Sequence, residues 1–266
     1  MRVRLLPCSL QRSAPDSTEP PAQPLTTFMV HGERGAGPLA IDAGSLGLVG
    51  DTDHMAAVRE VLLTHAHIDH VATLPMWLEA VVGEGRVPAR VHAPGPTVEA
   101  LRTHLFNDVL FPDFERIEDD RGRRLLELVE VPVDRPFALA GFTVRAFPTV
   151  HPVPTYGYLV DDGKTSVAFG ADSARNPALW QTVLTTPNVR AVVLETSFPD
   201  PLAELAEGSG HLTPATLREE LDAAPENVAV YVTHLKPSYR GPIARALEAL
   251  EDERLRVLPP GAEFTA

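Results

Sequence analysis

The sequence has one cysteine and no long apolar run, and both absences narrow the kind of protein it encodes. Cys8 cannot form an internal disulfide or a thiolate cage, so any bound metal ion must have nitrogen and oxygen ligands. No apolar run approaches the roughly 18 residues that a membrane span requires. Residues 1–7 lack the longer apolar core of an export signal, so we expect a cytoplasmic protein with no membrane partner.

Basic residues are also scarce relative to acidic ones. The chain has 23 Lys and Arg against 36 Asp and Glu, a formal net charge of −13. Such a chain repels anions at long range, so an anionic substrate must be attracted locally, for example by divalent cations in a cleft. A long nucleic acid is a poorer match, because its affinity rests on many Lys and Arg contacts with phosphate. We therefore expect no nucleic-acid partner.

The remaining composition is that of one large globular domain. Among the 266 residues, 44% are hydrophobic and 22% are charged. Strands cluster early and alternate with helices later, which predicts an α/β fold of two packed sheets with helices outside. Strands are expected at 3–6, 25–30, 39–43, 58–63, 89–92, 142–147, 156–160, 166–169, 191–194 and 228–232. Helices are expected at 71–82, 97–106, 177–185, 199–207, 214–223 and 241–250.

The stretch from about 84 to 135 interrupts this pattern. It carries eight Arg and no Lys against eleven acidic residues, with apolar residues such as Phe106, Phe111 and Phe114 beside the charges. We interpret it as an insertion in a single domain, residues 1–266. It covers one face as a lid or a homodimer contact, or it is a plain surface excursion.

The strongest signal is the run 65–70, which reads His-Ala-His-Ile-Asp-His directly after an apolar strand. Residues two apart in an extended segment point the same way, so His65 and His67 can reach one metal ion. Asp69 and His70, in the first turn of the helix expected next, can reach a second ion. Three neighbouring histidines would repel one another once protonated, and metal binding holds them neutral. The run therefore predicts a metal site rather than a solvated polar turn.

Three further residues of ligand type follow later strands. His151 comes after the strand 142–147, Asp172 after 166–169, and His234 after 228–232. Layered α/β folds place their sites just beyond the carboxyl ends of strands. Each residue alone is more typical of a turn, but together with the run 65–70 they form a coherent ligand set.

With these ligands in this order, the chain resembles the metallo-β-lactamase superfamily, which implies a four-layer αββα sandwich. Several segments also resemble the class II 3′,5′-cyclic-nucleotide phosphodiesterases: 101–107, 151–155, 195–199, 209–214 and 233–237. Two departures stand out. The family commonly has Gly-Asp-Thr-Gly where this chain has Ala-Asp-Ser-Ala at 171–174, and Thr73 occupies a usual glycine position.

The resemblance implies a reaction and a role for each ligand. His65, His67 and His151 would hold one Zn²⁺, Asp69, His70 and His234 would hold another, and Asp172 would bridge them. A hydroxide activated by both ions would hydrolyse a cyclic nucleotide, cyclic AMP above all, to a 5′-nucleotide. The candidate catalytic residues are Asp69, His211 and Glu195, with Glu195 orienting His211. His104 and Asn107 are candidate contacts to the nucleobase, and Asp42 is expected to order the backbone beneath the ligands.

Three alternatives remain open at this stage. The first is a tRNA 3′-processing endonuclease of the same superfamily, which the acidic chain disfavours. The second is a binding protein that senses cyclic nucleotides without hydrolysing them, which the altered turn at 171–174 makes conceivable. The third is a thioester or lactone hydrolase, since a fold does not fix a substrate.

Overall fold

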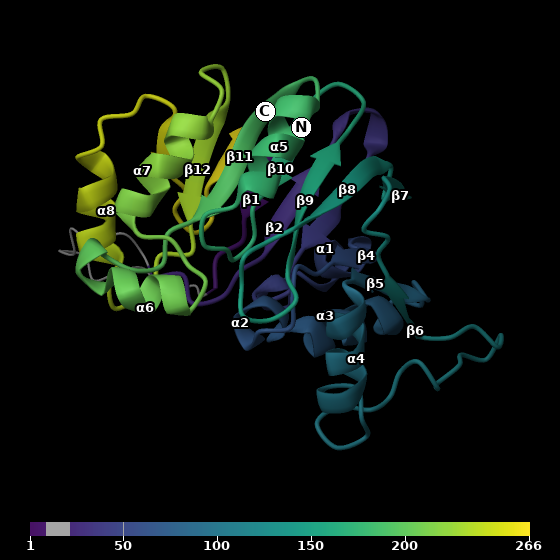
Figure 1. The fold of residues 1–266 in the computed structure, drawn as a ribbon. Coiled ribbons are helices and arrows are strands. Elements are labelled where there is room, and N and C mark those ends of the chain that lie inside the picture. The colour runs from purple at the N-terminus through teal and green to yellow at the C-terminus, as the bar shows by residue number, and fades with distance from the viewer. Residues whose placement is uncertain (9–21, 50) are drawn as a thin grey trace.

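Two seven-stranded sheets form the centre of the molecule in this computed structural model, which describes residues 1–8, 22–49 and 51–266 (Figure 1). The first sheet has the order β14 (Glu263–Thr265), β1 (Arg2–Leu5), β2 (Phe28–His31), β3 (Leu39–Ile41), β4 (Glu60–Leu62), β5 (Ala89–Ala93) and β6 (Leu126–Glu130). The second has the order β13 (Leu255–Val257), β12 (Ala229–Thr233), β11 (Val189–Glu195), β10 (Ser166–Phe169), β9 (Tyr156–Asp161), β8 (Phe142–Pro148) and β7 (Phe137–Leu139).

Helices follow the strands of both sheets and cover their outer faces (Figure 1). On the first sheet these are α1 (Thr52–Ala57), α2 (Ile68–Val71), α3 (Leu74–Gly83) and α4 (Gly95–His104). On the second they are α5 (Pro177–Thr185), α7 (Pro214–Ala223) and α8 (Arg240–Glu248), with α6 (Ala203–Gly208) beside them. Short 3₁₀ turns occur at Glu33–Gly35, Leu46–Leu48 and Asp200–Leu202. In the described residues, no helix has the length and apolar character needed to cross a membrane.

Three buried apolar clusters lie between these layers. The middle cluster joins the inner faces of the sheets, where Val30 and Ile41 of the first pack with Tyr158 and Phe169 of the second. One outer cluster lies under α3, and the other lies under α5, α7 and α8. Strands buried on both faces explain the near-continuous apolar runs of the sequence. The arrangement confirms the expected four-layer αββα fold.

Strand direction brings several loops to one edge of the sandwich. Strands β3 to β6 are parallel to one another, as are β10 to β13. Because β8 and β10 are both antiparallel to β9, they also run the same way. The loops that follow β4, β8, β10 and β12 therefore hold the residues 65–70, His151, Asp172 and His234 at strand ends, as the sequence predicted.

The structure corrects several expected boundaries. The helix expected at 71–82 is two helices, α2 and α3, because Thr73 leaves helical geometry and Pro75 begins a new first turn. The short strands β6, β7, β13 and β14 were not expected, since three to five residues at sheet edges carry little periodic signal.

The expected insertion contains more of the domain than its composition indicates. Residues 84–135 include β5, α4 and β6, which belong to the first sheet and its helical layer. Residues 105–125 lie outside helices and strands, and Leu105, Phe111 and Phe114 pack against the outer cluster. The role of this stretch as a lid or dimer contact stays a prediction.

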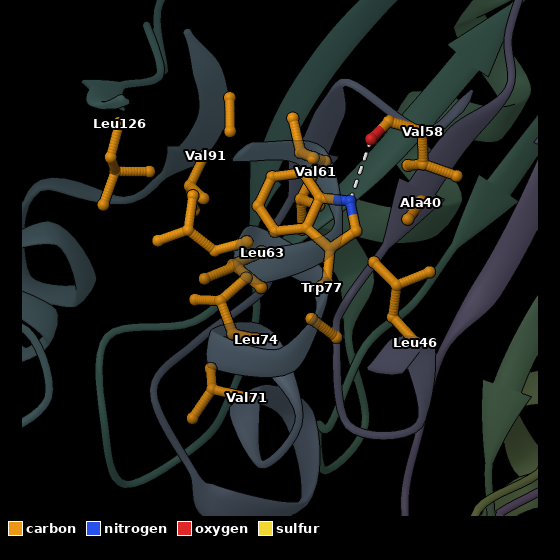
Figure 2. Packing of buried hydrophobic residues seen from close by; sticks show 14 of the residues in the cluster. Ala40, Leu46, Val58, Val61, Leu63, Val71, Leu74, Trp77, Val91 and Leu126 are labelled. Carbon is orange, nitrogen blue, oxygen red and sulfur yellow. Dashed lines mark hydrogen bonds between the residues drawn. The ribbon is translucent and has the colours of Figure 1, made fainter. Parts of the chain in front are cut away.

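Trp77 of α3 fills the centre of the first outer cluster (Figure 2). It is fully buried among side chains that include Leu46, Leu63 and Leu74. Its indole Nε1 donates a hydrogen bond of 2.8 Å to the backbone oxygen of Val58, so the ring both packs and satisfies a buried carbonyl.

We predict that Trp77→Phe lowers the free energy of unfolding by about 2 kcal/mol. The smaller ring leaves a gap, and the Val58 carbonyl loses its partner, a loss of about 1–3 kcal/mol. Urea unfolding followed by far-UV circular dichroism measures the change. An unchanged midpoint would contradict the packing described here.

Candidate metal centre

Seven side chains of ligand type converge at this edge of the sandwich. In one group, ligand atoms of His65, His67, His151 and Asp172 lie within 4.8 Å of one another. In a second group, the same holds for Asp69, His70, Asp172 and His234. The structure thus brings together every residue that the sequence nominated as a metal ligand, and Asp172 belongs to both groups.

The two groups meet on the carboxylate of Asp172. Its Oδ1 lies 3.5 Å from Nε2 of His70, and its Oδ2 lies 3.6 Å from Nε2 of His234 and 4.0 Å from Nε2 of His65. His234 Nε2 also lies 3.1 Å from Asp69 Oδ2. On the other side, His151 Nε2 and His67 Nδ1 are 3.3 Å apart. Asp172 therefore joins the two groups of possible metal ligands into one continuous cluster.

Hydrogen bonds at the outer ring nitrogens orient four of the histidines. In each case Nδ1 faces an oxygen, which leaves Nε2 directed into the cluster. The pairs are His65 with Thr64 Oγ1 at 3.0 Å, His70 with Asp42 Oδ2 at 2.7 Å, His151 with the Gly210 carbonyl at 3.1 Å and His234 with Ser197 Oγ at 2.9 Å. His67 differs, because its Nδ1 is the nitrogen that faces His151.

Two of the inward nitrogens lack any hydrogen-bond partner among the described residues. They are Nε2 of His65 and Nε2 of His70, on side chains that are almost completely buried. A buried polar atom without a partner costs about 1–3 kcal/mol, so the site calls for a ligand there. Imidazole and carboxylate donors are those that Zn²⁺ accepts, and the cluster is thus suited to binding metal ions.

Burial and charge set the protonation of the ligands. Burial lowers the pKa of His65 to about 2, and it also lowers the pKa values of His67 and His151, so these rings stay neutral and able to bind a metal. Burial acts to lower the pKa values of His70 and His234, but nearby carboxylates together raise both: Asp172 and Asp42 for His70, and Asp172 and Asp69 for His234. A metal ion therefore competes with protons mainly at these two residues.

Asp42 lies beneath the cluster and ties its segments together, as the sequence predicted. Its carboxylate accepts hydrogen bonds from the backbone N–H of Thr64 at 2.8 Å, from the Thr64 hydroxyl and from His70. The following turn lies against the ligand loop, since a Cβ on Gly44 would be 1.9 Å from the backbone oxygen of Asp69. Only glycine fits at that position.

Both departures from the family pattern are accommodated. Ala171 has a φ of 55°, the left-handed conformation for which glycine is preferred, so an alanine holds a strained backbone position where the family commonly has glycine. Thr73 has a φ of −111°, which needs no glycine. Its hydroxyl donates to the Ala43 carbonyl at 2.9 Å and accepts from the N–H of Gly47 at 2.7 Å.

His211 and Glu195 form a buried pair beside the ligands. Nδ1 of His211 lies 2.8 Å from Glu195 Oε1, which also accepts from the N–H of Leu212 at 3.0 Å. The imidazole ring of His211 is 5.2 Å from that of His151 and 5.9 Å from that of His234, centre to centre. Glu195 thus orients His211 toward the cluster, in the geometry that the sequence analysis anticipated.

The two candidate base contacts are not part of this cluster. His104 is exposed at the end of α4. The Asn107 amide donates to the Thr103 carbonyl and accepts from the N–H groups of Val109 and Leu110, so it stabilises its own loop. Among the described residues, no contact joins either side chain to the metal ligands.

Three supporting residues escaped the sequence analysis. Thr64, Ser197 and Gly210 each accept a hydrogen bond from a ligand histidine, yet serine, threonine and glycine are too common at strand ends to attract notice. Gly210 has a φ of 68°, and a Cβ there would lie 2.8 Å from Pro152, so the position admits only glycine. Ser197 and Gly210 lie in segments 195–199 and 209–214 of the family resemblance, which assigned no role to either residue.

Comparison with known proteins gives one family and a shared fold. A family model described as the beta-lactamase superfamily domain matches residues 47–235. Ribonuclease BN of Erwinia tasmaniensis is 29% identical over 106 residues, which are 40% of this chain and only 32% of that relative's length. Unliganded yeast PDE1 is 18% identical with a TM-score of 0.72, covering 100% of this chain and 99% of its own. The metallo-beta-lactamase fold protein YhfI from Bacillus subtilis is 17% identical with a TM-score of 0.70, covering 99% of each chain.

We predict that Asp42→Asn weakens Zn²⁺ affinity about 10-fold to 100-fold, because His70 loses the carboxylate that fixes its ring. Competition with a chromophoric chelator measures the affinity. The matched control is Asp51→Asn, which removes a similar carboxylate–histidine contact, 2.6 Å from His54, at an exposed position. Equal Zn²⁺ affinity in the two variants would contradict the role assigned to Asp42.

Proposed function

Because the chain belongs to the beta-lactamase superfamily domain family, we propose that it is a metal-dependent phosphodiesterase that hydrolyses 3′,5′-cyclic nucleotides, cyclic AMP in particular, to 5′-nucleotides. The observation that carries the proposal is the His211–Glu195 pair beside two ligand groups that share Asp172. A bridged pair of cations suits an in-line displacement at phosphorus, and an adjacent histidine suits the leaving oxygen. The fold shared with yeast PDE1 and the five segments noted in the sequence are consistent with this choice.

Two Zn²⁺ ions are the proposed cofactors. His65, His67 and His151 would hold one, Asp69, His70 and His234 would hold the other, and Asp172 would lie between them. When bound, zinc would supply charge for the phosphoryl oxygens and lower the pKa of water to about 7. Asp69 is the most accessible of the carboxylates, with 29% of its side chain exposed, so it would lie next to the substrate.

His211 would move the proton that the reaction requires. As the bond between phosphorus and the 3′ oxygen breaks and a water oxygen takes its place, the 3′ oxygen must gain a proton. Nδ1 of His211 donates its hydrogen to Glu195, which leaves Nε2 to deliver the proton to that oxygen. The proton lost by the attacking water balances the transfer.

A second candidate is cleavage of precursor tRNA, which the similarity to a ribonuclease BN raises. The distribution of charge disfavours it, since an RNA substrate needs free basic side chains. In the stretch 105–125 and the helix before it, three arginines are already paired with carboxylates. Arg102 lies 2.7 Å from Glu115, Arg116 lies 2.6 Å from Asp113, and Arg123 lies 2.7 Å from Asp119.

The deciding experiment incubates zinc-loaded protein with cyclic AMP, cyclic GMP, bis(p-nitrophenyl) phosphate and a precursor tRNA, and identifies the products. We expect 5′-AMP from cyclic AMP. Cleavage of the tRNA without action on cyclic AMP would favour the nuclease. Tight binding of cyclic AMP with no product over hours would identify a sensor, and turnover of thioesters or lactones alone would identify a different hydrolase.

We predict that His211→Ala lowers kcat for cyclic AMP about 100-fold to 10,000-fold, the usual contribution of a positioned acid. The same change costs less than about 10-fold with bis(p-nitrophenyl) phosphate, whose leaving group needs no proton. Zinc content, measured by mass spectrometry, should stay unchanged. Glu195→Gln should show the same pattern more weakly.

The matched control is His92→Ala, which removes a histidine that lies 2.7 Å from another carboxylate, Glu60, away from the cluster. Its kinetics should equal those of the unmodified protein. An equal loss with both substrates in His211→Ala would argue against proton transfer.

A further inference from the structure

Lysine is almost absent from this chain. The sequence has 21 arginines but only two lysines, Lys164 and Lys236. The ammonium of Lys164 lies 2.6 Å from Glu33 at an exposed position and so forms an ordinary surface ion pair. Lys236 lies two residues after the ligand His234. One of the two lysines therefore lies close in sequence to a metal ligand, in a chain whose basic side chains are otherwise arginines apart from Lys164.

Lys236 lines a pocket that adjoins the ligand groups. The pocket has a volume of about 240 Å³ and includes Asp69 and His234, with Ser238 and Tyr239 from the turn after β12. The backbone N–H of Tyr239 donates to the Lys236 carbonyl at 2.8 Å, which fixes this turn. The pocket is small, of a size for part of a small molecule rather than a polymer.

The Lys236 ammonium has no carboxylate partner among the described residues. It lies over the ring of Phe198, 5.2 Å from the ring centre. Phe198 also contacts the proposed proton donor, His211: the centres of the two rings are 5.7 Å apart. Phe198 thus holds a cation that no acidic residue of the described chain neutralises, within one aromatic ring of His211.

We propose that Lys236 binds the negative charge of the substrate and makes the site selective for small phosphodiesters over neutral esters and lactones. A compact ammonium with three donors suits a phosphate oxygen as a point charge, whereas a planar guanidinium is best matched by two oxygens bound side by side. In a chain with a net charge of −13, this local cation offsets the repulsion of an incoming anion. This inference rests on the proposed function, because it assigns Lys236 to the negative charge of a phosphodiester substrate.

The test compares zinc-loaded Lys236→Met with the unmodified protein on two substrates. For bis(p-nitrophenyl) phosphate we expect kcat/KM to fall about 10-fold to 100-fold, the range for one lost hydrogen bond between charged groups. For the neutral ester p-nitrophenyl acetate we expect no change. Lys236→Arg keeps the charge and should lose less activity than Lys236→Met. Lys164→Met is the matched control and should behave like the unmodified protein.

Binding of inorganic phosphate, measured by calorimetry on the same zinc-loaded proteins, supplies a readout that does not require turnover. We expect Lys236→Met to weaken it about 10-fold at unchanged zinc content. If the unmodified protein fails to hydrolyse cyclic AMP, the proposed function fails, and phosphate binding still tests Lys236. If Lys236→Met binds phosphate like Lys164→Met, or loses ester and diester turnover equally, the inference about Lys236 is wrong.

Discussion

A single buried carboxylate, that of Asp42, organises the floor of the metal centre. It is 2% exposed and lies where β3 ends, yet it accepts hydrogen bonds from the end of β4 through Thr64 and from α2 through His70. A buried charge is tolerated only when such donors surround it. The hydrogen bonds that offset the burial of Asp42 hold Thr64, next to His65, and His70 on the same carboxylate. They therefore help to fix the spacing between the ligands His65 and His70.

Strain gathers at the same edge of the sandwich. Seven non-glycine residues of the described chain have a positive φ, and three of them are Asp42, Ala171 and His234. Each follows a strand and carries or adjoins a side chain of the site. A left-handed conformation costs about 1–2 kcal/mol for such residues, and it persists where the surroundings over-determine it. At this edge the surroundings include hydrogen bonds such as the one from His234 to Ser197. They also include the packing of the ligand side chains around one another.

The ligands could be predicted because their chemistry is rare and their positions follow a rule. Histidines and carboxylates just past apolar strands meet at one edge when those strands run parallel, and the run 65–70 is too dense to overlook. The supporting atoms could not be predicted, since Thr64, Ser197 and Gly210 act through a backbone geometry that only the folded chain defines. The strand β6 was not expected for a related reason: the charges of the stretch 84–135 hide it, and its place in the sheet is fixed by pairing with β5. The sequence shows that lysine is rare, but it does not show that Lys236 lies over Phe198 and lines a pocket with Asp69 and His234.

The net negative charge of the chain constrains how its site can attract an anion. A protein with net charge −13 repels anions at long range, so attraction of an anion depends on positive charge confined to one place. In the first outer layer, Arg102, Arg116 and Arg123 are already paired with carboxylates, which weakens their attraction for a phosphate chain. The ligand cluster differs, because the inward nitrogens of His65 and His70 have no hydrogen-bond partner in the described part of the chain. A cation held at these nitrogens and at Asp172 would therefore supply local positive charge in a chain that is acidic as a whole.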